Sequence, residues 1–324
     1  MYNKDLYNKK EAKQFYENRY EDDYMDDWPL EKKQRISYVI RSLQLPDYGV
    51  ALDFGCGCGV FTNVIQKQLP KWKVYGCDIS NNAIENAKNR FPQCSFFVSD
   101  SDQVPNIKFD FLFSHHVLEH VFDIKKIIKD INNFLKPKSF ILHVLPCGNK
   151  GSFEYEVCSM RKDGINKKME NRFFFEDEGH VRRLTTDQTN KLMRKYSFFL
   201  NKEFYSNQYY GAVKWISQSH PKFILEFTNP SKGKNNKAIK FLFWSQLIFL
   251  FLFTLQLPMN LANRIKLIRN KKIYHYCLIV INLIPSIISY PFYTFINFKA
   301  DEEWKSKNQS INGSEMYLIY NRKL

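Results

Sequence analysis

The stretch that decides the fold is VALDFGCGCG, residues 50–59. An apolar run ends in Asp53, and a tight turn that contains Gly55, Gly57 and Gly59 leads into a helical pattern. Glycine tolerates positive φ and lets the backbone approach a ligand closely, and the start of the following helix supplies free N–H groups. The stretch therefore predicts a strand, a ligand-binding turn and a helix.

The spacing of these glycines argues against a dinucleotide site. A dinucleotide fingerprint needs G-x-G-x-x-G, but the position of its third glycine is Val60, and the spacing here is G-x-G-x-G. Asp53 lies two residues before the first glycine. A carboxylate at that place repels a pyrophosphate and attracts an ammonium or sulfonium group, so the turn suits a positively charged ligand.

Short apolar runs alternate with helical patterns on both sides of this stretch. The predicted strands are residues 50–54, 73–77, 95–98, 109–113, 140–145, 198–204 and 315–320, and the predicted helices between them are 61–69, 81–90, 124–135 and 185–196. Such alternation is typical of a doubly wound, Rossmann-like α/β fold, here with seven strands. Residues 147–180 are expected to form a long loop region beside the substrate.

The same pattern predicts the domain organisation. An N-terminal helical cap covers residues 1–45, the core covers 46–208, a hydrophobic and basic helical insertion covers 209–312, and the last core strand lies in 313–324.

Two further acids follow the next two strands. Asp78 lies 19 residues after Gly59, at the end of the second strand, where an acid accepts hydrogen bonds from ribose hydroxyls. Asp100 follows the third strand and is placed to receive an adenine amino group. The three acids together predict a nucleoside ligand with a cationic end.

At these residues the sequence resembles the class I S-adenosylmethionine-dependent methyltransferases. The similarity also includes the fourth strand followed by Val-Leu-Glu-His, and Leu-Lys-Pro before the fifth strand; it covers about residues 15–205 and the last strand. It implies S-adenosyl-L-methionine as the cofactor. The residues that it implies for binding are Arg35, Asp53, Phe54, Gly55, Cys56, Gly57, Gly59, Asp78, Ile79, Asp100, Ser101 and His115.

Within this family, the sequence is similar to bacterial methyltransferases of quinone biosynthesis and of surface glycans or lipids. In the quinone O-methyltransferases an arginine before the first strand holds the cofactor carboxylate, and Arg35 lies at the matching place. The alternative for Arg35 is a solvated helix arginine.

Histidines are the candidates for a catalytic base, because their pKa lies near neutral pH. His116 ranks first, at the carboxyl edge of the fourth strand, and His180 second; His180 also fits a substrate ligand or a helix cap. His115 fits a backbone contact to the cofactor, while Glu119 and His120 belong to a motif that is often structural. We predict no metal site, because the Cys-x-Cys pair lies inside the cofactor turn without further ligands.

The tyrosines Tyr16 and Tyr20 lie on one side of the first helix, before an acidic run at residues 21–27. They either cover the cofactor as part of a lid or pack the helix onto the core. The acids are interpreted as a solvated face.

Charge is distributed unevenly along the chain of 324 residues, whose net charge is +15. Residues 201–324 hold 17 Lys and Arg against 6 Asp and Glu. Between Glu226 and Asp301 there are ten basic residues and no acid, interleaved with uncharged apolar runs at 241–262 and 277–298. Basic charge beside apolar runs predicts an anionic membrane surface as a partner, and it argues against nucleic acid, for which basic charge among polar residues is typical.

Each apolar run is long enough to cross a bilayer, although Pro285 and Pro291 are expected to interrupt the second. Two full spans would place the basic link between them on the far side, against the positive-inside rule. We therefore expect an in-plane or re-entrant pair. The alternatives are a spanning pair, and helices buried as a cap or as an oligomer interface.

Composition bounds the remaining possibilities. With 44% hydrophobic and 25% charged residues the chain is globular rather than disordered, and seven cysteines are too few for a disulfide scaffold. The first ten residues have no apolar signal-like core, so we expect a reduced, cytoplasmic protein that is peripheral on the inner face of the cell membrane.

These inferences combine into one functional hypothesis with three rivals. We expect an S-adenosylmethionine-dependent methyltransferase that methylates an oxygen of a membrane-associated acceptor, either a small molecule or a lipid-linked one. A lipid-linked glycan leads, and an isoprenoid lipid is next. The rivals are a quinone-biosynthesis O-methyltransferase, an RNA methyltransferase and a catalytically inactive membrane adaptor.

Overall fold

The computed structural model describes residues 9–21, 27–99, 101, 104–267 and 272–322. The chain forms two units. The first consists of Met1–Pro146, Leu184–Phe204 and Met316–Leu324, and the second of Cys147–Arg183 and Tyr205–Glu315. The second unit thus holds residues 147–183 together with the segment expected as an insertion.

A seven-stranded sheet organises the first unit, with the strand order β3-β2-β1-β4-β5-β9-β8. Parallel pairing joins β3 to β2, β2 to β1, β1 to β4 and β4 to β5. The sheet confirms the predicted doubly wound fold, and the strand order reverses beside β1, where ligands bind in such sheets. The strands are β1 (Val50–Phe54), β2 (Lys73–Asp78), β3 (Ser95–Val98), β4 (Phe109–His115), β5 (Leu135–Pro146), β8 (Phe198–Ser206) and β9 (Glu315–Arg322).

The helices of the first unit begin at local signals in the sequence. Ser80 and Asp123 cap two of them, each with a side chain that accepts a backbone N–H, and Thr185 forms a capping box with Gln188. These helices are α1 (Lys9–Glu21), α2 (Leu30–Arg41), α3 (Val60–Gln68), α4 (Asn81–Arg90), α5 (Ile124–Phe134) and α7 (Thr186–Arg194).

The fifth strand differs from the prediction, since it begins at Leu135 rather than at residue 140. Helix α5 ends at Phe134, and Pro137 lies within the strand. The ladder accommodates it because Leu135 pairs with Phe109 and Phe140 pairs with Phe111, which leaves an irregularity between the two pairs. A proline that donates no hydrogen bond is tolerated at such a place.

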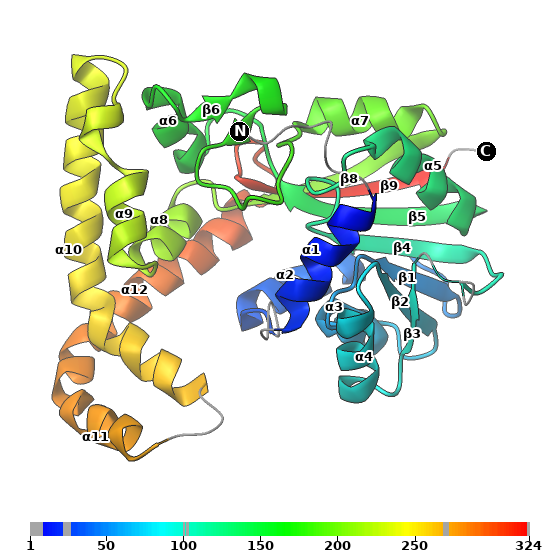
Figure 1. Cartoon of the computed structure of the whole chain (residues 1–324), viewed down its shortest axis with the longest axis horizontal. Helices are drawn as coiled ribbons and strands as arrows, with labels where there is room; N and C mark the ends of the chain where they lie inside the picture. The colour runs from blue at the N-terminus through cyan, green and yellow to red at the C-terminus, as the bar shows by residue number, and fades with distance from the viewer. Residues whose placement is uncertain (1–8, 22–26, 100, 102–103, 268–271, 323–324) are drawn as a thin grey trace. The chain divides into compact units, whose positions relative to one another are not determined.

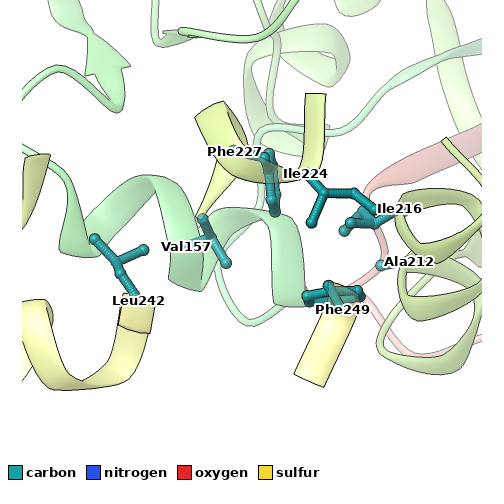
Figure 2. Packing of buried hydrophobic residues seen from close by; sticks show 7 residues of the cluster. All are labelled: Val157, Ala212, Ile216, Ile224, Phe227, Leu242 and Phe249. Carbon is teal, nitrogen blue, oxygen red and sulfur yellow. The ribbon is translucent and has the colours of Figure 1, made fainter. Parts of the chain in front are cut away.

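Residues 147–180, expected as a loop region, contain regular structure, so that expectation was wrong in part. Helix α6 (Phe153–Met160), a 3₁₀ turn η1 (Lys167–Met169) and an antiparallel pair of two-residue strands, β6 (Ile165–Asn166) and β7 (Arg172–Phe173), lie there. Such short elements have little periodicity of their own. Packing holds them: Figure 2 shows Val157 of α6 in one buried cluster with Ala212, Ile216, Ile224, Phe227, Leu242 and Phe249.

The described part of residues 209–312 is mainly helical, with short turns between the helices (Figure 1). Helices α11 and α12 meet at a bend of 65°. The bend lies at Asn282, so the expectation that Pro285 and Pro291 interrupt the run was wrong. Pro285 falls in the first turn of α12, where its missing N–H has no partner to lose, and α12 continues through Pro291. The elements are α8 (Tyr210–Ser217), α9 (Pro221–Phe227), η2 (Pro230–Lys232), α10 (Asn236–Leu267), α11 (Ile273–Ile281) and α12 (Leu283–Lys307).

Within the described part of the chain, one helix has the length and apolarity to cross a membrane. It covers Asn236–Ile265, with a mean hydropathy of 1.9. The bent pair α11 and α12 passes the same test if the two helices form one span.

The sheet core gives a direct stability test. Leu52, in the central strand β1, is fully buried, whereas Leu30 at the start of α2 is 67% exposed. We expect Leu52→Ala to lower the free energy of unfolding by about 2–5 kcal/mol through lost burial and a cavity. The matched variant Leu30→Ala should stay within about 0.5 kcal/mol of the wild type. Urea titration followed by circular dichroism measures the free energy of unfolding of both variants. If the two substitutions lowered it equally, β1 would not be central to the core.

Candidate functional site

The glycine turn after β1 has the backbone that its sequence requires. Gly55, Gly57 and Gly59 have φ values of 76°, 51° and 78°, in the left-handed region. A Cβ atom at Gly55 would lie 2.4 Å from Cγ2 of Val117, and one at Gly57 would lie 2.8 Å from the hydroxyl oxygen of Tyr20. Side chains are therefore excluded from both positions, and a ligand can approach the bare backbone.

Two buried carboxylates flank this turn. Asp53 is 1% exposed, and its Oδ2 accepts a hydrogen bond of 2.6 Å from the Thr62 hydroxyl. Asp78 is also buried, and its two oxygens accept the backbone N–H groups of Gly57 at 2.9 Å and of Ser80 at 3.1 Å. Asp78 thus fixes the conformation of the turn from the end of β2.

Burial raises the pKa of both acids. It raises the pKa of Asp53 to about 7; the hydrogen bond from Thr62 opposes the shift and the charge of Asp78 adds to it. Burial also raises the pKa of Asp78, against the backbone N–H groups that stabilise its charged form. Two neighbouring anions with little water are stabilised by a cation, so the site favours a ligand with a positively charged end.

The other predicted cofactor residues lie around this turn or away from it. Phe54 ends β1, Ile79 follows β2, and both the N–H and the hydroxyl of Ser101 bond to the carbonyl of Val98. Arg35 is buried on α2. Asp100 lies outside the described residues. The binding roles of these residues remain predictions.

Cys56 contributes backbone rather than side chain to the turn. Its thiol packs in a buried cluster with Ile84, Ala87 and Phe96. Burial raises the pKa of this thiol well above its ordinary value, so it stays protonated. The side chain therefore has a packing role.

Aromatic rings gather at the carboxyl end of β4. The ring of His115 lies 4.4 Å from that of Phe61, 4.4 Å from that of His116 and 4.6 Å from that of Trp28, measured between centroids. Sequence reasoning missed Trp28, because it precedes α2 outside any periodic pattern and only tertiary packing brings it to β4. The cluster forms a wall of flat rings at the edge where ligands bind in this fold.

His116 has an unusual backbone and a carboxylate partner. Its φ of 54° is left-handed, which is uncommon for a residue other than glycine. Its Nδ1 lies 2.9 Å from Oε1 of the buried Glu119. A carboxylate at Nδ1 holds the proton there and leaves the lone pair on Nε2, which is the arrangement that a general base needs.

His180 lies in the second unit, in a network of buried charges. Its Nδ1 is 3.6 Å from Oε1 of Glu176, and the same oxygen accepts a hydrogen bond of 2.6 Å from Arg183. Burial raises the pKa of Glu176, but Arg183 and His180 together lower it below its ordinary value. This environment agrees with a structural role at least as well as with a catalytic one, and the role of His180 as a base remains a prediction.

Asp53 gives the site a pH signature. The amino-acid end of S-adenosylhomocysteine carries an ammonium group that the ionised carboxylate attracts and the protonated acid does not. Because the pKa of Asp53 is about 7, we expect the affinity for S-adenosylhomocysteine to rise about tenfold or more between pH 5.5 and 7.5. Isothermal titration in matched buffers measures this.

Asp53→Asn is the control for that experiment. It removes the titrating group and keeps the shape, so its binding should be weak and nearly independent of pH. Wild-type affinity that stays flat or falls as the pH rises would contradict the assignment of Asp53.

Comparison with known proteins places this geometry in a family. Residues 21–201, more than half of the chain, match the model of a methyltransferase domain. Malonyl-[acyl-carrier protein] O-methyltransferase 2 of Ilyobacter polytropus is 30% identical over 95 residues, which cover 28% of this chain and 37% of the relative. Trans-aconitate 2-methyltransferase of Variovorax paradoxus is 28% identical over 134 residues, which cover 40% and 47%.

The chain thus spans less than half the length of these curated relatives. Among solved structures, a TehB-like S-adenosylmethionine-dependent methyltransferase from Corynebacterium glutamicum aligns with a TM-score of 0.39 and 17% identity, over 61% of this chain and 88% of the other. The glycine turn and the paired carboxylates fit S-adenosyl-L-methionine as the cofactor. The chain is a member of the class I S-adenosylmethionine-dependent methyltransferases.

Proposed function

We propose that this methyltransferase methylates an oxygen of a membrane-associated acceptor while it is docked on the cytoplasmic face of an anionic membrane. A lipid-linked glycan is the first candidate for the acceptor, and an isoprenoid lipid such as a quinone precursor is the second. The observation that carries the proposal is the broad exposed apolar surface of α10, α11 and α12, which basic side chains accompany.

Helix α10 carries much of this surface. Its buried face combines apolar residues of the cluster in Figure 2, Leu242 and Phe249, with the polar residues Ser245, Gln256 and Asn260. The amide of Gln256 donates a hydrogen bond of 2.9 Å to the hydroxyl of Ser217. The outer face carries exposed apolar side chains, namely Phe243, Trp244, Leu247, Ile248, Phe251 and Leu257. A helix that is apolar on its outer face is stable in lipid or against a partner, and not in water.

The bent pair α11 and α12 repeats the pattern. At the bend, the side-chain amide of Asn282 donates to the carbonyl of Pro258 at 2.7 Å and to the hydroxyl of Ser286 at 3.0 Å. These polar groups tie the bend to α10 on the inside. The exposed apolar side chains of the pair include Ile273, Val280, Ile281, Leu283, Ile284, Ile287, Ile288, Phe295 and Phe298.

Basic side chains accompany this surface, which we call the apolar surface of α10–α12. Lys237 and Lys240 are exposed near the start of α10, Arg264 is exposed near its end, and Lys272 is exposed before α11. The sequence from 227 to 300 holds no acid. Positive charge beside exposed apolar side chains favours anionic lipid headgroups over a neutral protein partner.

The chemistry of the first unit supports transfer to oxygen. When bound, S-adenosyl-L-methionine supplies a methyl group that is bonded to a positively charged sulfur. In this proposal His116, oriented by Glu119, accepts the proton of an acceptor hydroxyl as the hydroxyl oxygen bonds to the methyl carbon and the carbon–sulfur bond breaks, which leaves S-adenosylhomocysteine. The ring cluster around His115 would exclude water and orient the acceptor. The relative from Ilyobacter polytropus is itself named as an O-methyltransferase.

Membrane docking is tested with liposomes and the full chain. Ile284 and Ile288 are 70% and 66% exposed on α12, and Ile311 is 61% exposed outside α10–α12. We expect the wild type to float with liposomes of phosphatidylglycerol and phosphatidylethanolamine, and the double variant Ile284→Asp/Ile288→Asp to bind about tenfold less, because buried charge is costly in the membrane. Flotation and quantitative blotting measure the bound fraction.

Ile311→Asp is the matched control, and it should bind like the wild type. Intact wild type that stays soluble and ignores these liposomes at low salt would refute docking. If the wild type instead assembles into oligomers that the double variant loses, without binding lipid, the surface is an oligomer interface.

The base is tested by transfer of labelled methyl from S-adenosyl-L-methionine to a membrane extract. We expect His116→Ala to lower kcat by about 10²–10⁴-fold, with S-adenosylhomocysteine binding within a few-fold of the wild type. Glu119→Gln should lower kcat less and shift its pH dependence, because the imidazole loses its anionic partner. Unchanged kcat in His116→Ala would remove His116 from the reaction.

A further inference from the structure

Helix α1 is attached to the first unit through one side chain with many bonds. The carboxylate of Glu17 accepts hydrogen bonds from the N–H of Asn81 at 2.8 Å and of Asn82 at 3.1 Å. It also accepts from the Ser80 hydroxyl at 2.7 Å and from the Asn81 side chain at 2.8 Å. In addition, the carbonyl of Glu17 accepts from the side chain of Asn82 at 3.2 Å.

These bonds join α1 to the beginning of α4, where backbone N–H groups lack helical partners and an anion is stabilised. Partial burial raises the pKa of Glu17, but the hydrogen bonds from the start of α4 together lower it below its ordinary value. Glu17 is therefore ionised at neutral pH, and the attachment is at full strength there.

The same helix reaches the cofactor turn. Tyr20, three residues after Glu17, places its hydroxyl oxygen 2.8 Å from the position that a Cβ of Gly57 would occupy. Tyr16 packs its ring edge-on against His120, with centroids 5.9 Å apart. One face of α1 thus contacts both the glycine turn and the loop after β4.

Ser80 connects the two ends of this arrangement. Its hydroxyl donates to Glu17, and its N–H donates to Asp78, whose other oxygen accepts from the N–H of Gly57. A continuous set of hydrogen bonds therefore runs from α1 through the end of β2 to the turn. Movement of α1 would shift Tyr20 away from Gly57. It would also break the hydrogen bond from Ser80 to Glu17, next to Asp78, which holds the turn.

From these contacts we propose that Tyr20 is a cofactor-contacting residue and that Glu17 is the positioning residue that latches α1, and with it Tyr20, over the glycine turn. The latch is made of polar contacts near the surface, which open at lower cost than buried apolar packing. Opening of α1 admits and releases the cofactor, and closure retains it. The inference concerns the cofactor and holds for any methyl acceptor.

The proposal is tested by the kinetics of S-adenosylhomocysteine binding to the full chain. Glu17→Gln weakens the latch, so α1 opens more often, and we expect both association and release to become about tenfold faster, with a smaller change in Kd. Tyr20→Phe keeps the latch but removes the hydroxyl, so release alone should become faster, by about threefold to tenfold. Stopped-flow binding and a rapid-filtration chase of radiolabelled ligand measure the two rates.

Two further variants control the experiment. Glu17→Asp keeps the charge with a shorter reach and should restore part of the wild-type rates. Gln14 lies on the same helix and bonds to Asn18 in the exposed region, so Gln14→Ala should match the wild type. Thermal melting of each apoprotein separates a local change from loss of fold.

The result that overturns the proposal is a release rate within twofold of the wild type in both Glu17→Gln and Tyr20→Phe. Slower association in Glu17→Gln would also overturn it, since that outcome means that α1 helps to form the site rather than to close it. If Glu17→Gln melts early, Tyr20→Phe alone decides whether the hydroxyl contacts the cofactor.

Discussion

The structure depends on two carboxylates held out of water at the carboxyl ends of adjacent parallel strands. Asp53 pairs in register with Gly76 on β2, and glycine there leaves space, since a Cβ would meet Phe96 at 2.7 Å. Asp78, two residues later, fixes the turn through the N–H of Gly57. Two desolvated anions so arranged are unfavourable by themselves, and a cationic ligand relieves the cost. Cofactor choice thus follows from the electrostatics of the strand ends.

The second unit has a buried apolar core, but its helices α10–α12 also expose many large apolar side chains. Gln256 and Asn282 make hydrogen bonds inside the helical layer, whereas large apolar side chains such as Val280 and Phe251 are more than 60% exposed. An exposed apolar surface of this extent is typical of a contact with a membrane or a partner. The surface that we propose for the acceptor therefore suits a lipid environment, whereas the cofactor site suits a polar ligand. One chain carries both.

Much of the fold could be predicted because its signals are local. Val50–Phe54, Asn81–Arg90 and Ser95–Val98 lie where the sequence places them, since alternation, glycine and capping residues determine such elements within a few positions. Elements that depend on tertiary packing could not be predicted from the sequence. The short helix α6 is stabilised by residues far along the chain, and the bend at Asn282 depends on a carbonyl of α10.

The residues of the candidate site likewise fall into those that local sequence predicts and those that only tertiary packing brings together. The glycines and their acids follow from spacing, but the approach of Trp28 to His115 and the latch of Glu17 join segments separated by many residues, without periodicity to reveal them. His116 was predicted from its position at a strand end, while its left-handed backbone and its close contact with Glu119 emerge only in three dimensions.

The most direct test of the central claim is a crystal structure of the full chain with S-adenosylhomocysteine. The account predicts that the ligand lies over the glycine turn, with its ribose hydroxyls at Asp78 and its ammonium group directed to Asp53. A ligand bound elsewhere, or a pyrophosphate-containing molecule in that turn, would contradict it.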